Sequence, residues 1–202
     1  VRLRYNSGLR IAANGRELAQ GLERLVKYWP GPLQSITIVG HSMGGLLARS
    51  AVHEGRRASH RWPALVKHLV FLGTPHHGAP LERAGHGADL LLALSPYSAP
   101  LARLGRLRSA GITDLRHGHL RHPDEGRPDA PLPLPAGVAC FGVAACLAPR
   151  RGLLAERLVG DGLVPLRSAL GEHDDPARRL VFARGSLRVL HRTGHLDLLS
   201  SP

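Results

Sequence analysis

A serine between glycines, in the segment GHSMG at residues 40–44, is the clearest candidate for covalent chemistry in the chain. A run rich in β-branched residues, 35–39, precedes it, and an apolar helical pattern follows it. This order is typical of a sharp strand-to-helix turn, which strains the serine backbone and projects its Oγ from the carboxyl end of a sheet. The glycines are expected to make room for the turn. We predict that Ser42 is a nucleophile and that the N–H of Met43 supplies half of an oxyanion hole; the alternative is a glycine-rich turn with an inert serine.

A serine hydroxyl needs a base to take its proton, and the base needs an acid to orient it. After a serine turn of this type, the acid and then the histidine follow along the chain. Of the 13 histidines, only His173, His191 and His195 come late enough. His195 is the best candidate, because it follows the strand-like stretch LRVLH through a tight loop and opens the segment HLDLL. A packed role is expected for His191 within that strand, and a solvated loop for His173.

The best candidate for the acid is Asp161, in the segment GDGLVP. It follows the strand-like VACFGVAA by a loop, and its flanking glycines allow the carboxylate to turn toward a histidine at a neighbouring strand end. Asp174 and Asp175 are the alternatives, although their place before Pro176 indicates an exposed loop. Asp197 is expected in the first turn of a last helix, where a carboxylate suits the helix dipole.

The segments GHSMGG, FLGTPHHGAP, GDGLVP and HLDLL together resemble the α/β-hydrolase superfamily, in its lipase and esterase branch, which includes GPI inositol-deacylase-like proteins. The resemblance runs from the first residues to the end of the chain. It implies hydrolysis of carboxylic esters through an acyl-enzyme, in which Ser42 attacks, His195 moves the proton and Asp161 orients the imidazole. It implies no metal and no organic cofactor, and a small acyl ester or a lipid as the substrate.

Three further histidines are expected to line the pocket: His41 beside the serine, and the pair His76 and His77 after a predicted strand. Such a pair could bind a metal ion. No further Cys, His or acidic residue stands at a supporting spacing, however, so we favour a role in shaping the pocket through hydrogen bonds.

The wider pattern predicts an α/β fold, a mostly parallel sheet with helices on both faces. Helices are expected from about Asn14, as the N-cap, to Trp29, and from Ser42 to about Gly55. Strands are expected at residues 1–5, 35–39, 67–73, 138–145 and 187–191. The chain would form one domain, 1–202, with a cap or lid insertion at 75–135 that carries short helices at 88–94 and 101–107.

An expected motif is missing upstream of Ser42. The second oxyanion donor usually comes from a loop after an early strand, often with a His-Gly motif, and residues 1–12 contain none. We interpret the chain as lacking its first strands and expect weak activity from it, because one oxyanion donor contributes about 100- to 1,000-fold in turnover.

The composition limits the classes of partner. A net charge of +12 is spread over scattered arginines, without a long basic run or a zinc-finger spacing, so no nucleic acid partner is expected. Cys140 and Cys146 are expected as buried thiols, too far apart on one strand for a disulfide. No run is long enough to span a bilayer and no signal peptide is recognised, which leaves a cytoplasmic location by default and a peripheral membrane contact open. The sequence does not predict the oligomeric state.

Two other functions stay open. The same serine, acid and histidine could support acyl transfer or thioester hydrolysis. Alternatively, the chain could be a non-catalytic basic fragment that keeps the scaffold and binds polyanions or a membrane surface.

Overall fold

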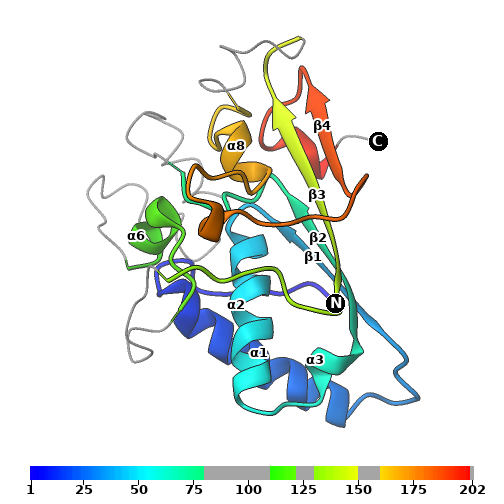
Figure 1. Ribbon diagram of the computed structural model, residues 1–202. Coiled ribbons are helices and arrows are strands. Elements are labelled where there is room, and N and C mark those ends of the chain that lie inside the picture. Colours follow the sequence, from blue (N-terminus) through cyan, green and yellow to red (C-terminus); the bar gives the residue numbers. More distant parts are fainter. Residues whose placement is uncertain (80–109, 122–129, 150–159, 201–202) are drawn as a thin grey trace.

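The computed structural model describes residues 1–79, 110–121, 130–149 and 160–200 and shows an α/β fold (Figure 1). Its sheet has four strands, all parallel, in the order β1-β2-β3-β4. The strands are β1 Ile36–His41, β2 Val66–Leu72, β3 Ala139–Cys146 and β4 Leu187–His191. The helices are α1 Ile11–Lys27, α2 Met43–Arg57, α3 Trp62–Leu65, α6 Ala110–His117 and α8 Leu166–Ala169, with the short 3-10 turns η3 Pro176–Arg178 and η4 Asp197–Leu199.

Four of the five predicted strands are present within two residues of their expected ends, but the strand predicted at residues 1–5 is wrong. That segment has no regular structure. The alternation of VRLRY indicates two unlike faces, but a strand also needs a partner with which to form backbone hydrogen bonds. The sheet of the described residues therefore begins at β1, which lies at its edge.

The first helix begins at Ile11, three residues before the predicted cap. Asn14 lies inside α1, where its side-chain amide donates to the carbonyl of Asn6 at 2.8 Å. The start of the helix is held from outside instead, because Asp114 of α6 accepts a hydrogen bond from the N–H of Ile11 at 3.0 Å. The helices predicted at 88–94 and 101–107 lie outside the described residues, as does most of the predicted insertion at 75–135.

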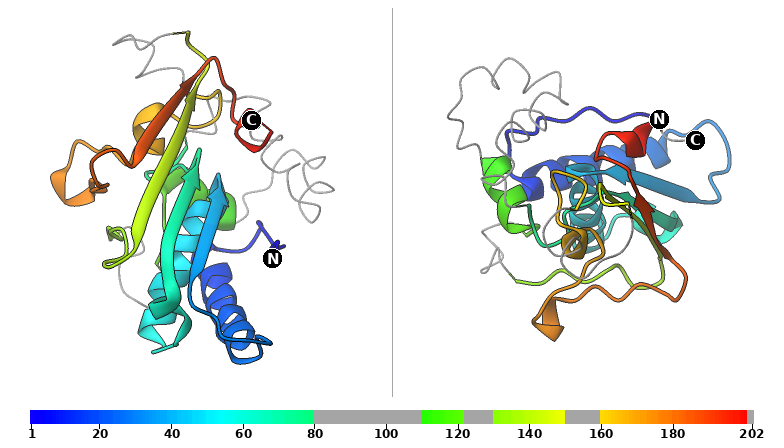
Figure 2. Two further views of the ribbon diagram at one scale, coloured as in Figure 1. Left: turned by 90° about the vertical axis from the view of Figure 1, so that its right-hand side faces the viewer. Right: turned by 90° about the horizontal axis from the view of Figure 1, so that it is seen from above.

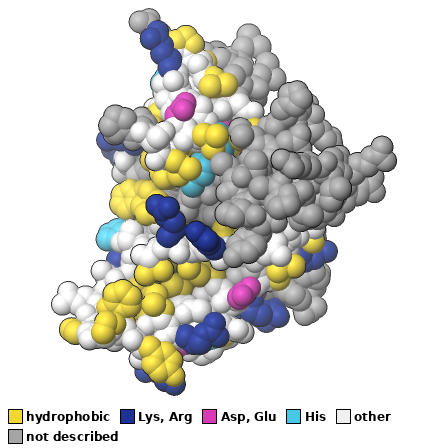
Figure 3. Space-filling view, turned by 180° about the vertical axis from the view of Figure 1, so that it is seen from behind, with side chains coloured by type: hydrophobic (Ala, Val, Ile, Leu, Met, Phe, Trp, Pro, Cys, Tyr) yellow, Lys and Arg dark blue, Asp and Glu magenta, His cyan; other side chains and the backbone are white. Residues whose placement is uncertain are grey.

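The two faces of the sheet are covered unequally. Helix α2 packs against β1 and β2, and α1 packs against α2 (Figures 1 and 2). On that side Leu69 and Phe71 are buried. On the opposite face, Val39, Val70 and Phe141 form a row across β1, β2 and β3. In this row Val39 is 61% and Phe141 38% exposed. Seen from behind, the molecule shows several groups of hydrophobic side chains on its surface (Figure 3).

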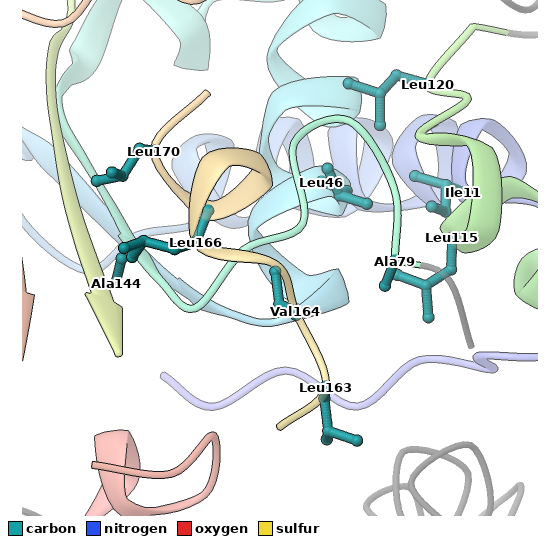
Figure 4. Packing of buried hydrophobic residues seen from close by; sticks show 11 residues of the cluster. Ile11, Leu46, Ala79, Leu115, Leu120, Ala144, Leu163, Val164, Leu166 and Leu170 are labelled. Atoms are coloured by element: carbon teal, nitrogen blue, oxygen red, sulfur yellow. The ribbon is translucent and has the colours of Figure 1, made fainter. Parts of the chain in front are cut away.

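The core consists of two clusters of mainly aliphatic residues, in keeping with the scarcity of aromatic residues in the sequence. One lies between α1, α2 and the sheet and contains the largest buried side chain, Trp62, with Leu69 and Phe71. The other surrounds Leu46 near the carboxyl ends of the strands and takes in Val164 and Leu166 (Figure 4). This second cluster holds the loop after β3 in place, which matters for the site below.

Cys140 and Cys146 are both buried and free, as predicted. Burial raises the pKa of the Cys140 thiol to about 11. None of the helices in the described parts of the chain has the length and the apolar content needed to cross a bilayer.

Candidate active site

Ser42 lies at the turn between β1 and α2 in a strained conformation. Its φ of 52° and ψ of −127° place a residue with a side chain in a region that favours glycine. The N–H of Ser42 donates to the carbonyl of Leu72 at the end of β2 at 2.8 Å, and its own carbonyl accepts from the N–H of Gly45 at 3.1 Å. Neighbouring elements therefore hold the strained residue in place from both sides.

Two glycines, Gly40 and Gly45, make this turn sterically feasible. A Cβ on Gly40 would come within 2.6 Å of the Gly45 backbone, and a Cβ on Gly45 would overlap the buried side chain of Thr74. Apart from its neighbours in the chain and the backbone of its own helix, no described atom lies within 4 Å of a Cβ placed on Gly44, the second glycine of the GxSxG pattern. The expectation that both motif glycines make room therefore fails for Gly44, and the following glycine takes its place.

Asp161 and His195 form a buried pair. The Nδ1 of His195 lies 2.7 Å from Oδ2 of Asp161, and each side chain is at most 2% exposed. The backbone joins them as well, because the N–H of His195 donates to the carbonyl of Asp161 at 3.2 Å. The other carboxylate oxygen, Oδ1, accepts from the N–H groups of Leu163 at 3.0 Å and Val164 at 2.7 Å. Since Val164 is anchored in the core cluster (Figure 4), the carboxylate has a fixed orientation.

His41, directly before Ser42, and Gly73, directly after β2, both lie close to the imidazole of His195. The ring of His41, directly before Ser42, lies 4.7 Å from it between centroids. Gly73 directly follows Leu72, the partner of the Ser42 N–H, and a Cβ on Gly73 would come within 3.1 Å of His195 Nδ1. Both Ser42 Oγ and His195 Nε2 are buried, and neither has a hydrogen-bond partner in the described structure. The hydroxyl and the free imidazole nitrogen thus belong to one small region at the carboxyl ends of β1 and β2.

His41 fixes the backbone of the histidine loop. Its Nε2 lies 3.0 Å from the carbonyl oxygen of His195, and a carbonyl only accepts, so Nε2 carries the proton. Burial lowers the pKa of His41 below its ordinary value, which keeps the ring neutral at neutral pH. Met43 is the first residue of α2, so its N–H is one of the helix donors without a partner in the helix.

His76 and His77 lie elsewhere. They line a cavity together with Arg49, and none of Ser42, Asp161 or His195 lines it. Among the residues that the structure describes, no group of three or more His, Cys, Asp or Glu side chains could hold a metal ion.

The alternative acids and histidines considered in the sequence analysis form no described hydrogen bond with the side chains of Asp161 or His195. Asp174 is 89% exposed and binds Arg167, and Asp175 caps the short turn η3. Asp197 lies in the first turn of η4, as predicted, and accepts from the N–H of Gly194 at 2.8 Å. His191 ends β4, and the ring of His173 packs against that of His77, with 5.0 Å between their centroids.

Sequence reasoning missed Gly73 and the two N–H groups of Leu163 and Val164. Gly73 has a φ of 55° and opens the segment GTPHHG, so its place after a buried strand was an available signal. The N–H donors had no sequence signal, because any residue other than proline supplies one.

A family model described as "PGAP1-like alpha/beta domain" matches residues 15–124, just over half of the chain. The chain belongs to the PGAP1-like alpha/beta domain family. The matched residues of this PGAP1-like domain include the serine turn, whereas Asp161 and His195 lie beyond them. None of the curated proteins compared with the chain matches it.

Solved structures similar to this PGAP1-like chain include lipases and esterases. The mature form of a Bacillus licheniformis lipase is 21% identical with a TM-score of 0.50, and the match covers 95% of this chain and 69% of that one. A metagenomic carboxyl esterase is 21% identical with a TM-score of 0.51, covering 93% and 52%. Lipase 1 from Pelosinus fermentans is 14% identical with a TM-score of 0.51, covering 84% and 67%. The chain thus spans roughly half to two thirds of their length. The predicted α/β-hydrolase fold is confirmed.

Proposed function

We propose that this chain carries the catalytic site of a serine hydrolase that cleaves carboxylic esters. One observation carries the proposal: the buried pair of His195 and Asp161, joined at 2.7 Å, lies against the ring of His41, which directly precedes the strained Ser42. Within the described structure, both Nε2 of the imidazole and the serine hydroxyl are buried without a hydrogen-bond partner. A base oriented by an acid beside an unpartnered hydroxyl is the arrangement that activates a serine nucleophile.

In the proposed reaction, Ser42 Oγ attacks the ester carbonyl carbon while His195 Nε2 takes the hydroxyl proton. Asp161 holds Nδ1–H and stabilises the imidazolium that forms. The N–H of Met43 faces the negative oxygen of the tetrahedral intermediate. As the intermediate collapses, the C–O bond to the alcohol breaks and Nε2 returns the proton to the leaving oxygen. Water then enters, gives a proton to Nε2 and attacks the acyl-serine. As this second intermediate collapses, the bond from carbon to Ser42 Oγ breaks and Nε2 returns the proton to Oγ, which releases the acid and the free serine.

The fixed carboxylate favours this assignment of roles. Two backbone N–H groups bind Oδ1 of Asp161, so Oδ2 is left to accept the proton of His195 Nδ1. With the proton held at Nδ1, the lone pair is on Nε2, where a general base needs it. The tautomer is therefore set by the fold before any substrate binds.

An acyl ester or a lipid is the substrate class we propose. The support comes from similarity of fold, since the neighbours are named as lipases and a carboxyl esterase. The second oxyanion donor, which the sequence did not identify, is assigned to no described residue.

The test is labelling by a fluorophosphonate, which reacts only with an activated serine. The chain should be labelled at Ser42, and Ser42→Ala should abolish the signal. Ser59 is a suitable control, because it also has a positive φ, 53°, but lies beyond the opposite end of α2. Ser59→Ala should be labelled like the original chain. Labelling that persists in Ser42→Ala, or a folded chain that is not labelled at all, would refute the proposal.

A further inference from the structure

A small cavity beside α2 is lined by basic side chains and lies apart from the proposed catalytic residues. Its volume is about 70 Å³, more than the roughly 10–15 Å³ that one water molecule needs. No carboxylate is among its described lining residues. The polar side chains that line it are Arg49, Arg178, His76, His77, His117 and His173.

Arg49 and His76 each present a buried N–H group without an acceptor. The guanidinium Nη1 of Arg49 lies 3.2 Å from Nδ1 of His76, and Nη2 donates to the carbonyl of Leu132. A guanidinium can only donate, so Nδ1 of His76 is the acceptor and the ring proton is on Nε2. Neither that Nε2–H nor the Nε–H of Arg49 has a partner in the described structure. Because folded proteins rarely leave buried donors unsatisfied, these two N–H groups indicate that the cavity receives an acceptor from outside the chain.

The positive charge of Arg49 also lacks a carboxylate partner in the part of the chain that the structure describes. Burial lowers the pKa of Arg49 to about 10, which still leaves it charged at pH 7. Among the described residues, no carboxylate contacts it. Glu172 and Asp174 line an adjoining cavity, and both contact Arg167 there. A buried charge without a partner is costly to the folded state, so an anion bound in the cavity would stabilise it.

We propose that this cavity binds a small tetrahedral oxyanion, a phosphate ion or a phosphate ester group. The donors approach from several directions: Arg49 from α2, His76 from the loop after β2, and Arg178 from η3. A tetrahedral anion presents oxygens in all of these directions, whereas a planar carboxylate presents them in one plane. The site does not depend on the proposed ester hydrolysis, because none of the three proposed catalytic residues lines the cavity.

Titration of the full chain with inorganic phosphate, by calorimetry and by thermal unfolding, tests the proposal. Ionic strength is held constant with sodium chloride so that general screening does not contribute. We expect saturable binding and a melting temperature that rises with phosphate. Arg49→Met should weaken the affinity at least 10-fold, and Arg178→Met several-fold. The matched control is Arg184→Met, which removes an exposed arginine in the turn before β4 and should bind phosphate like the original chain.

Removal of Arg49 should not itself unfold the protein, since it removes an uncompensated buried charge. If Arg49→Met nevertheless fails to fold, the phosphate affinity of Arg178→Met, compared with that of Arg184→Met, tests the proposal instead. The proposal is overturned if phosphate stabilises the chain no more than chloride does, or if the folded variants of the cavity bind phosphate as tightly as Arg184→Met. Phosphate binding that persists in Ser42→Ala would show that the anion does not occupy the catalytic site.

Discussion

Replacing Asp161 by asparagine should trap His195 in the wrong tautomer without disturbing the fold. In the original chain Oδ1 accepts the N–H groups of Leu163 and Val164, at 3.0 and 2.7 Å, and Oδ2 accepts from His195 Nδ1 at 2.7 Å. The asparagine must keep its carbonyl oxygen at the Oδ1 position, because an amide NH₂ there would face two N–H donors. Its NH₂ group then points at His195 Nδ1, which has to accept. The ring proton moves to Nε2, and the base is lost.

The two backbone hydrogen bonds set the size of the effect. An amide flipped to restore the correct tautomer would leave both buried N–H groups unsatisfied, at about 1–3 kcal/mol each. Reaction through that flipped state would therefore add about 2–6 kcal/mol to the barrier, which corresponds to a loss of about 30-fold to about 10⁴-fold in rate. The melting temperature should change little, since the loop retains its acceptor.

The assay is kcat/KM for a p-nitrophenyl ester, with the rate of fluorophosphonate labelling as a second measure of serine activation. Asp197→Asn is the control, because Asp197 binds the N–H of Gly194 next to His195 but does not contact the imidazole in any described hydrogen bond. It should retain most of the activity. The reasoning fails if Asp161→Asn folds normally and keeps its rate within 10-fold of the original chain.

Two further predictions concern the serine turn and the behaviour in acid. Gly45→Ala should lower the free energy of unfolding by about 1–3 kcal/mol and reduce labelling, because its methyl group would overlap the buried side chain of Thr74. Gly44→Ala has free space for the methyl group and should be neutral or stabilising. Urea unfolding compares the two variants, and equal losses of stability would contradict the steric argument. Burial and the charge of Arg49 lower the pKa of His76 well below 6.5, so below about pH 6.5 the unfolded state binds one proton more than the folded state. The free energy of unfolding should therefore fall as the pH drops below about 6.5, by up to about 1.4 kcal/mol per pH unit. Unfolding measured against pH in phosphate-free buffer should show a shallower slope for His76→Gln, and an unchanged slope would mean that this histidine is not responsible.

The sequence predicted those features that depend on local patterns. Four strands were found because short apolar runs between turn residues identify buried strands, and Ser42, Asp161 and His195 were selected by order and context. Helix α6 was missed, since AGITDLRH is short and lies in a polar stretch. What could not be predicted depends on contacts distant in sequence: only the position of Thr74 reveals that Gly45 rather than Gly44 is sterically required. Likewise, the burial of Arg49 could not be predicted from the sequence, because it depends on contacts with His76 and with the carbonyl of Leu132, which are distant along the chain.

The order of the strands has a consequence for the exposed row of Val39 and Phe141. The strands of the sheet follow one another in the order of the chain, β1 to β4, without a reversal. Crossovers between parallel strands are right-handed in nearly all proteins, and with a single direction of winding they all run over the same face. Helices reach both faces of such a sheet only where the winding direction changes. The side that the described helices leave exposed is therefore a consequence of the order of the strands rather than of composition.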